Sequence, residues 1–231
     1  YNVQGGRYRK LQISFGPPTL LFELVINYED GTCTTVHSDN NWKYDFSPVT
    51  FNCIYGGEDY DARREQKGWN QIGFDDSHWR PVVVQEAPKG ILRPQMAAPV
   101  KIMERYDIQK VTKLNADQVA SASVSTKRTV DLSAFVLDMG QNLAGFPEIT
   151  VRGKRGQKVT LIVAEALTDE GACNQRQTGR QHYYEYTLKG EGDETWHPRF
   201  SYYGFRYIQV EGAVLKGQKN PQKLPVLKNI Q

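Results

Sequence analysis

Cysteine and methionine are scarce in this sequence, and long apolar runs are missing from it. Only three cysteines and three methionines occur among 231 residues, against thirteen tyrosines. No apolar run comes near the roughly 20 residues that a membrane-spanning helix requires. A net charge of +3 is too small to indicate nucleic-acid binding. We therefore expect neither a membrane nor a nucleic acid among the partners of the chain.

The three cysteines do not form a recognisable framework. Cys33 and Cys53 can face each other on neighbouring strands, but Cys173 would then be left over. An odd number of cysteines does not build a set of disulfides, and the spacing matches no metal-binding pattern. We interpret them as three ordinary thiols, with their pairing and the redox compartment left open.

Many tyrosines favour strands over helices, because aromatic rings suit a pleated, half-buried surface. Residues 20–28 alternate between apolar and polar side chains, and an Asp-Gly pair separates them from a second strand at 32–37, as in a tight hairpin. A third strand is expected at 49–55. Residues 56–77 are rich in glycine and charge, so we interpret them as a long ordered loop with one helical turn near 61–65.

Prolines mark the middle of the chain. They recur between residues 81 and 99, where they oppose regular pairing, so we place a domain boundary there. Residues 159–164 are apolar on nearly both faces, which is typical of a central strand. Strand-length segments lie at residues 100–108, 129–138, 148–151, 159–166, 182–189 and 203–211. With no helix of convincing length, these patterns predict an all-β fold of two β-sandwich units.

Two glycine-containing loops in the second half resemble hairpin turns. Residues 190–193 separate two aromatic runs, and residues 152–158 separate the strands that end at Val151 and start at Val159. The second loop is basic, which suits either a solvated turn or the attraction of an anionic glycan or phosphate. We interpret it as a solvated hairpin loop.

Short motifs follow one another in a fixed order along the chain. In the second half they are Asp138 to Gly145, the turn at Gly156, Ala164 to Leu167, Tyr186 to Gly190 and Trp196 to Tyr207. Their order resembles the concanavalin-like β-sandwich domain of bacterial α-L-rhamnosidases, glycoside hydrolase family 78. In the first half, Tyr55 to Arg63, Gly68 to Asn70 and Gly73 to Trp79 are similar to hallmarks of the N-terminal domain of the same family. The resemblance covers roughly residues 15–215.

The resemblance implies a function for a longer parent protein. In that family, inverting hydrolysis of terminal α-L-rhamnosides in plant or bacterial glycans uses carboxylic acids carried on an (α/α)6 barrel. The resemblance places that barrel after Gln231, so it assigns no catalytic residue and no cofactor to this chain. It implies the barrel domain of the parent and rhamnose-containing glycans as partners, and it favours a periplasmic or secreted parent.

The same resemblance implies a division of the chain. Residues 1–92 correspond to a truncated N-terminal β-sandwich of jelly-roll type, and residues 95–213 to a complete concanavalin-like sandwich. Residues 214–231 are rich in lysine, proline and glutamine, as linkers are, and would lead to a missing catalytic domain. Because Tyr1 replaces an initiator methionine, we expect a piece of a longer protein. Truncation would leave unpaired strand edges and an uncovered apolar face, so we expect the chain to dimerise or to be only modestly stable.

Acidic residues of the 56–77 segment are the first candidates for chemistry. Glu58 and Asp61 can be read as an acid/base pair, since glycosidases need two carboxyl groups across a cleft. The alternative, which we favour, is that they pair with nearby arginines or accept backbone N–H groups. Asp75 and Asp76 are weak candidates for calcium, which takes about six to eight oxygens. An Asx-turn explains them as well.

Tryptophans and a later polar cluster complete the candidates. Trp69 and Trp79 are weak candidates for carbohydrate binding, although we expect Trp79 to anchor its loop to the core. Asp138, with Gln141 and Asn142 beside it, can hydrogen-bond a sugar or cap a sharp turn that uses Gly140 and Gly145, and we favour the turn. We expect the Arg206 cation to stack on a ring or to pair with Glu165 or Glu185.

Three functions therefore stay open. The favoured one is a non-catalytic accessory region of an α-L-rhamnosidase. The second is a carbohydrate-binding module with its own site for rhamnose or a galactose-type sugar. The third is an autonomous β-sandwich hydrolase.

Overall fold

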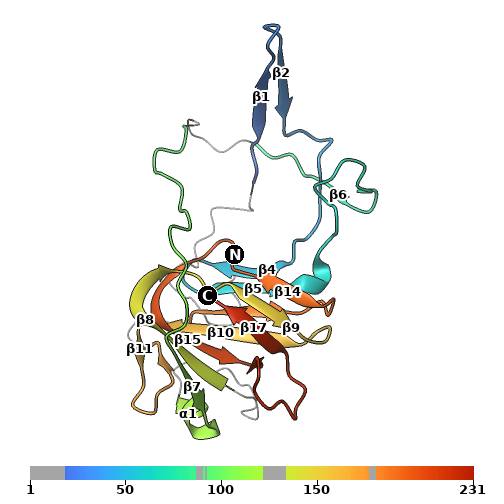
Figure 1. The fold of residues 1–231 in the computed structure, drawn as a ribbon. Helices are drawn as coiled ribbons and strands as arrows, with labels where there is room; N and C mark the ends of the chain where they lie inside the picture. The colour runs from blue at the N-terminus through green and yellow to red at the C-terminus, as the bar shows by residue number, and fades with distance from the viewer. Residues whose placement is uncertain (1–18, 87–90, 92, 122–133, 177–180) are drawn as a thin grey trace. The chain divides into compact units, whose positions relative to one another are not determined.

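In the computed structural model, nearly all of the regular secondary structure consists of β-strands (Figure 1). It describes residues 19–86, 91, 93–121, 134–176 and 181–231. The helical elements within these ranges are α1 (Ala116–Ser121) and a single 3-10 turn, η2 (Ala62–Arg64). The prediction of an all-β fold is therefore confirmed.

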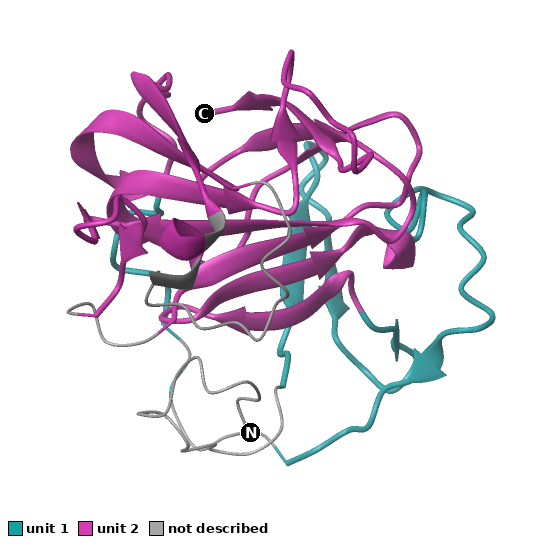
Figure 2. Ribbon diagram, turned by 90° about the horizontal axis from the view of Figure 1, so that it is seen from below, with its two compact units in different colours: residues 1, 13–46, 66–100 teal, residues 2–12, 47–65, 101–231 magenta. Residues whose placement is uncertain are grey.

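The chain divides into two compact units, and the division does not follow the sequence in one cut (Figure 2). Unit 1 contains the described residues of Ile13–Phe46 and Gln66–Val100. Unit 2 contains Ser47–Glu65 and the described residues of Lys101–Gln231. The predicted domain boundary near residues 92–95 therefore misses one segment, because residues 47–65 belong with the second half.

Unit 1 contains two small two-stranded sheets. Strands β1 (Glu23–Asn27) and β2 (Cys33–His37) form the predicted antiparallel hairpin, closed by a turn in which Asp30 accepts the Thr32 N–H at 2.9 Å. Strands β3 (Lys43–Tyr44) and β6 (Arg80–Pro81) form the other sheet. None of its described residues is buried, so within them the unit has no apolar core. The dimerisation expected from exposed strand edges stays a prediction.

Unit 2 is a sandwich of two larger sheets. The first is seven-stranded, in the order β4 (Val49–Cys53), β5 (Gly57–Asp61), β13 (Tyr183–Thr187), β10 (Lys158–Ala164), β15 (Tyr203–Glu211), β8 (Ala134–Gly145) and β7 (Lys110–Leu114). The second is four-stranded, in the order β14 (Asp193–Trp196), β9 (Ile149–Arg152), β17 (Val226–Ile230) and β16 (Val214–Leu215). A short hairpin of β11 (Ala166–Leu167) and β12 (Cys173–Asn174) completes the unit.

One apolar core joins the two sheets of unit 2. It includes Leu161 and Ile208 from the large sheet and Ile149 and Leu227 from the small one, all nearly or fully inaccessible to solvent. Strand β10 lies between β13 and β15, which confirms its predicted central place. Its apolar residues on both faces follow from that position.

An aromatic group in this core ties the first half of the chain to the second. The Tyr60 ring stacks on Tyr186 with centroids 5.8 Å apart, and both rings lie against Trp196, at 6.0 and 5.3 Å. Aromatic pairs at such distances contribute about 0.5–1.5 kcal/mol beyond the area they bury. Strand β5, which carries Tyr60, is therefore part of the core.

Strand β5 lies in the segment that we predicted as a loop. Three of its five residues are acidic, so the sequence gives it little strand character. It forms because it pairs in parallel with β13 and antiparallel with β4. Its charges find partners mainly outside these two strands, Glu58 in the loop between β14 and β15 and Asp61 in Arg63. The predicted helical turn near residues 61–65 is confirmed by η2, which Asp61 caps. The strand predicted at 100–108 is absent, and β7 follows instead.

The two predicted hairpin loops are connections between sheets. Residues 153–157 join β9 of the small sheet to β10 of the large sheet, and residues 188–192 join β13 to β14. These loops meet each other: a Cβ on Gly190, whose φ is +84°, would lie 2.5 Å from the Arg155 amide nitrogen. Only glycine allows this approach.

The C-terminal segment forms part of the sandwich, although we predicted a linker. Strand β17 pairs with β9, and β16 pairs in parallel with β17. Leu227 and Ile230 are both buried in the core, which the shift in the pairing of β17 with β9 between Leu227 and Asn229 allows. The lysines that suggested a linker lie mainly in the loop between the two strands.

We predict that Leu227→Ala lowers the free energy of unfolding of the chain by about 2–4 kcal/mol, because it leaves a cavity between the sheets. The matched control is the exposed neighbour Asn229→Ala, which should change it by less than about 0.5 kcal/mol. Urea unfolding followed by tryptophan fluorescence measures both. Equal, small effects would show that this segment is the linker the sequence suggested.

Candidate functional site

Glu58 is the most deeply buried carboxylate among the predicted site residues. It lies in β5, and its side chain has no solvent exposure. The carboxylate accepts the backbone N–H groups of Arg199 and Phe200 at 3.1 Å each, and the Asn52 amide at 3.3 Å. Glu58 therefore fixes the loop between β14 and β15, which lies far from it in the sequence.

Burial raises the pKa of Glu58, and the hydrogen bonds from Arg199, Phe200 and Asn52 oppose this shift only in part. A raised pKa can mark a general acid. Here, however, the carboxylate oxygens already accept three donors. The arrangement is that of a carboxylate that orders a loop.

Glu58 and Asp61 cannot act as the acid/base pair that the sequence suggested. They are three residues apart on one strand, so their side chains leave opposite faces of the sheet. Asp61 binds the Arg63 guanidinium through both oxygens at 2.8 Å and accepts the Arg63 backbone N–H. Hydrogen bonding to Arg63 lowers the pKa of Asp61. The structural interpretation is confirmed for both carboxylates.

Asp138 and Arg206 form a second fixed pair across two strands. The Arg206 guanidinium binds both carboxylate oxygens of Asp138, at 2.8 and 3.0 Å, and lowers the pKa of this carboxyl group. The guanidinium also lies 5.1 Å from the centroid of the Tyr207 ring. The expected ring contact is thus present, but the expected pairing with Glu165 or Glu185 is wrong. Glu185 pairs with Lys158 at 2.7 Å instead.

The turn expected after Asp138 is an interruption within one long strand. Strand β8 continues to Gly145, and its pairing with β15 shifts between Phe205 and Tyr207. Asp138 also accepts the Gly140 N–H at 2.7 Å, and Gly140 has the expected positive φ of 86°, whereas Gly145 is not among the glycines with positive φ. The long bent strand explains why this polar cluster interrupts an apolar run.

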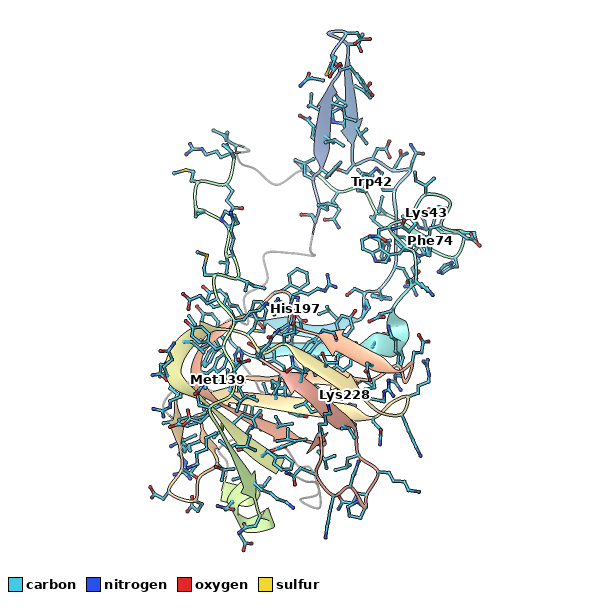
Figure 3. The ribbon with its side chains drawn as sticks, viewed as in Figure 1. Trp42, Lys43, Phe74, Met139, His197 and Lys228 are labelled. Atoms are coloured by element: carbon cyan, nitrogen blue, oxygen red, sulfur yellow. The ribbon has the colours of Figure 1, made fainter. Side chains whose placement is uncertain are left out.

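The tryptophan and calcium candidates lie in unit 1. The Trp79 indole donates to Gln66 at 2.8 Å and packs against Phe74 at 5.7 Å, so it anchors its loop. The Trp69 side chain is 62% exposed. Asp75 accepts the Ser77 N–H in an Asx-turn. Asp76 binds Lys43 at 2.8 Å; Lys43 and Phe74 are marked in Figure 3.

No metal cluster and no disulfide emerges within the residues that the structure describes. No group of three or more histidine, cysteine, aspartate or glutamate side chains gathers there. Cys33, Cys53 and Cys173 are free, and burial raises the pKa of the Cys173 thiol. None of the helices within the described ranges is long and apolar enough to span a membrane.

Sequence reasoning missed the partners of the candidate residues. It did not identify the loop that Glu58 holds, because those partners are backbone N–H groups of Arg199 and Phe200, 141 and 142 residues away. The one sequence feature that could have pointed to this role of Glu58 was its place directly after a glycine, in a segment without periodicity. The arrangement of Glu58, Asp61 and Asp138 can stabilise the sandwich, because each of these carboxylates is held by described donors.

Two family models match successive parts of the chain. The α-L-rhamnosidase N-terminal domain matches residues 1–104, and the bacterial α-L-rhamnosidase concanavalin-like domain matches residues 128–228. An α-L-rhamnosidase of Formosa agariphila is 35% identical over 212 residues, which are 88% of this chain and 20% of the relative.

Solved structures give the same result. The α-L-rhamnosidase of Streptomyces avermitilis complexed with L-rhamnose is 33% identical, with a TM-score of 0.70 over 90% of this chain and 19% of that one. The α-L-rhamnosidase of Aspergillus terreus is 32% identical, with a TM-score of 0.71 over 90% of this chain and 22% of that one. The chain thus spans about a fifth of the length of the relatives it matches.

We predict that Glu58→Gln destabilises the chain, because the amide nitrogen of glutamine cannot accept a hydrogen bond, whereas both oxygens of the carboxyl group can, ionised or protonated. The cost should be about 1–3 kcal/mol for an unsatisfied buried N–H group. The exposed Glu191→Gln serves as the control and should have little effect. Urea unfolding at several pH values measures both.

The raised pKa of Glu58 predicts how the effect of Glu58→Gln on the free energy of unfolding changes with pH. The native pKa of Glu58 is raised, so the native state binds the proton more readily than the unfolded chain. The stabilisation that this proton provides is complete below the ordinary value of 4.5 and is lost as the pH rises through the native value. The difference in free energy of unfolding between the wild type and Glu58→Gln should therefore become smaller from pH 4.5 to pH 7. A widening gap would contradict the burial effect.

Proposed function

Because the chain belongs to the α-L-rhamnosidases of glycoside hydrolase family 78, of which it carries the N-terminal and concanavalin-like domains, we propose that it supports the catalytic domain of a larger rhamnosidase. The parent hydrolyses terminal α-L-rhamnosides in plant or bacterial glycans. Its catalytic barrel, which lies in the same chain, is the principal partner of this region.

The commitment of the candidate carboxylates to structural partners is the observation that carries this proposal. Glu58 orders a loop through backbone N–H groups, while Asp61 and Asp138 each bind an arginine through two oxygens. A glycosidase needs one carboxyl group free to give a proton and a second facing it across the sugar. The bidentate pairs instead hold Asp61 and Asp138 in place, which suits a domain that supports another.

A sugar-binding role for unit 1 is the second candidate, and the exposed Trp69 indole favours it. An exposed aromatic face can stack on a sugar ring, whereas Trp79 is already engaged by Gln66 and Phe74. Calorimetric titration with L-rhamnose would support this role if Trp69→Ala abolished the heat and Trp79→Phe did not.

We predict that the 231-residue chain does not hydrolyse a chromogenic α-L-rhamnoside above the buffer rate, whereas the full-length parent does. The reason is that the acid and base are carried elsewhere in the parent. Release of the chromophore, followed by absorbance, measures both proteins at equal concentration. Turnover by the chain at an enzyme-like rate of about 1 per second or more would contradict the proposal.

A further inference from the structure

Three loops of unit 2 meet at one corner of the sandwich. They are residues 153–157, residues 188–192 and the loop of residues 216–225 between β16 and β17. The Gln157 side chain joins two of them: its oxygen accepts the Lys154 N–H at 2.7 Å, and its amide donates to the Lys223 carbonyl at 2.9 Å. Gly190 packs directly on the Arg155 backbone and brings in the third.

The loop of residues 216–225 has a defined conformation. The Asn220 side chain donates to the Leu224 carbonyl and accepts the Leu224 N–H, both at 2.8 Å. Lys223 has a φ of +53° and is the only described non-glycine residue with a positive φ. Such a conformation costs about 1–3 kcal/mol and tends to persist at functional sites. The structure thus holds a lysine where glycine or asparagine would be less strained.

This corner holds five cations for which the structure shows no ion pair, against one exposed carboxylate, Glu191, in the loop of residues 188–192. We call the exposed cations Lys154, Arg155, Lys216, Lys219 and Lys223 the basic corner. None of the ion pairs in the described part of the chain involves them.

The neighbouring cations, by contrast, are paired. Lys158 binds Glu185 at 2.7 Å and Lys189 binds Glu65 at 2.6 Å. Lys228, marked in Figure 3, binds Asp193 at 2.8 Å. Five unpaired cations in a chain whose net charge is only +3 form a local field that attracts anions.

We propose that the basic corner binds an acidic polysaccharide, one that carries uronate or sulfate groups. Nucleic acid and protein fit less well. The three loops contain no aromatic residue on which a base can stack. None of the exposed large apolar side chains of the described chain lies within them, whereas protein interfaces have an apolar centre. The corner offers only spaced charges and amide groups, which match charged groups repeated along a glycan.

This proposal deepens the proposed function, on which it rests. A rhamnoside cleaved by the parent would then belong to an acidic glycan, and the basic corner would raise its concentration near the enzyme. The five cations lie on loops that contact one another, and the fields of neighbouring charges add over distances comparable to the Debye length, about 8 Å at physiological salt.

The test is affinity electrophoresis of the 231-residue chain in gels that contain dextran sulfate, polygalacturonate or neutral dextran. We expect both acidic polymers to retard the chain, less so as salt rises, and neutral dextran not to retard it. Lys154→Gln combined with Lys223→Gln should weaken binding about tenfold, since each cation near an anionic surface contributes several-fold. The control combines Lys101→Gln with Lys110→Gln, which removes the same charge from exposed positions outside the corner.

Three results would overturn the proposal: no retardation by either acidic polymer, an equal loss of binding in the control, or tighter binding of a single-stranded DNA oligonucleotide than of either polymer. The assay contains no rhamnoside and no catalytic domain. Its failure would therefore leave the proposed function standing, and hydrolysis by the isolated chain would overturn the proposed function without touching this result.

Discussion

Parallel pairing of β5 with β13 is the interaction on which the rest of unit 2 depends. It extends over residues Gly57 to Asp61 and Tyr183 to Thr187. A Cβ on Gly57 would collide with the Tyr183 carbonyl, so glycine at this position, with a φ of +94°, permits the approach. Through this contact, a segment from the first half of the chain becomes part of the large sheet.

Two consequences follow from this pairing. It directs Tyr60 into the core beside Tyr186, and it brings Glu58 to the loop between β14 and β15. The carboxylate loses solvation and gains backbone donors, which is how a buried acid can serve structure and not catalysis. These carboxylates are therefore fixed by structural partners, and five cations for which the structure shows no ion pair lie together at the basic corner.

The sequence predicted those elements whose signal is local. The β1–β2 hairpin follows from alternation and an Asp-Gly turn, and the central place of β10 follows from its apolar residues. Strand β5 could not be predicted, because its acidic residues are satisfied only by distant partners. The loops at 153–157 and 188–192 look like hairpins locally, since glycine marks a reversal without showing which sheet the chain enters next. Strand β17 was hidden by the lysines that precede it.

The sequence indicated which candidate residues would be held by ion pairs or hydrogen bonds, but it did not identify most of their partners. Asp61 pairs with Arg63, two residues away, and this the sequence could anticipate. The bond between Asp138 and Arg206 spans 68 residues and depends on the shift in pairing between β8 and β15. No local pattern contains that information.

Native-state hydrogen exchange tests most directly whether residues 47–65 are integral to unit 2. Amides of β5 that bond to β13 should exchange as slowly as those of β10, because both would open only when the sheet unfolds. Exchange of β5 as fast as that of the exposed β1–β2 hairpin would contradict this account.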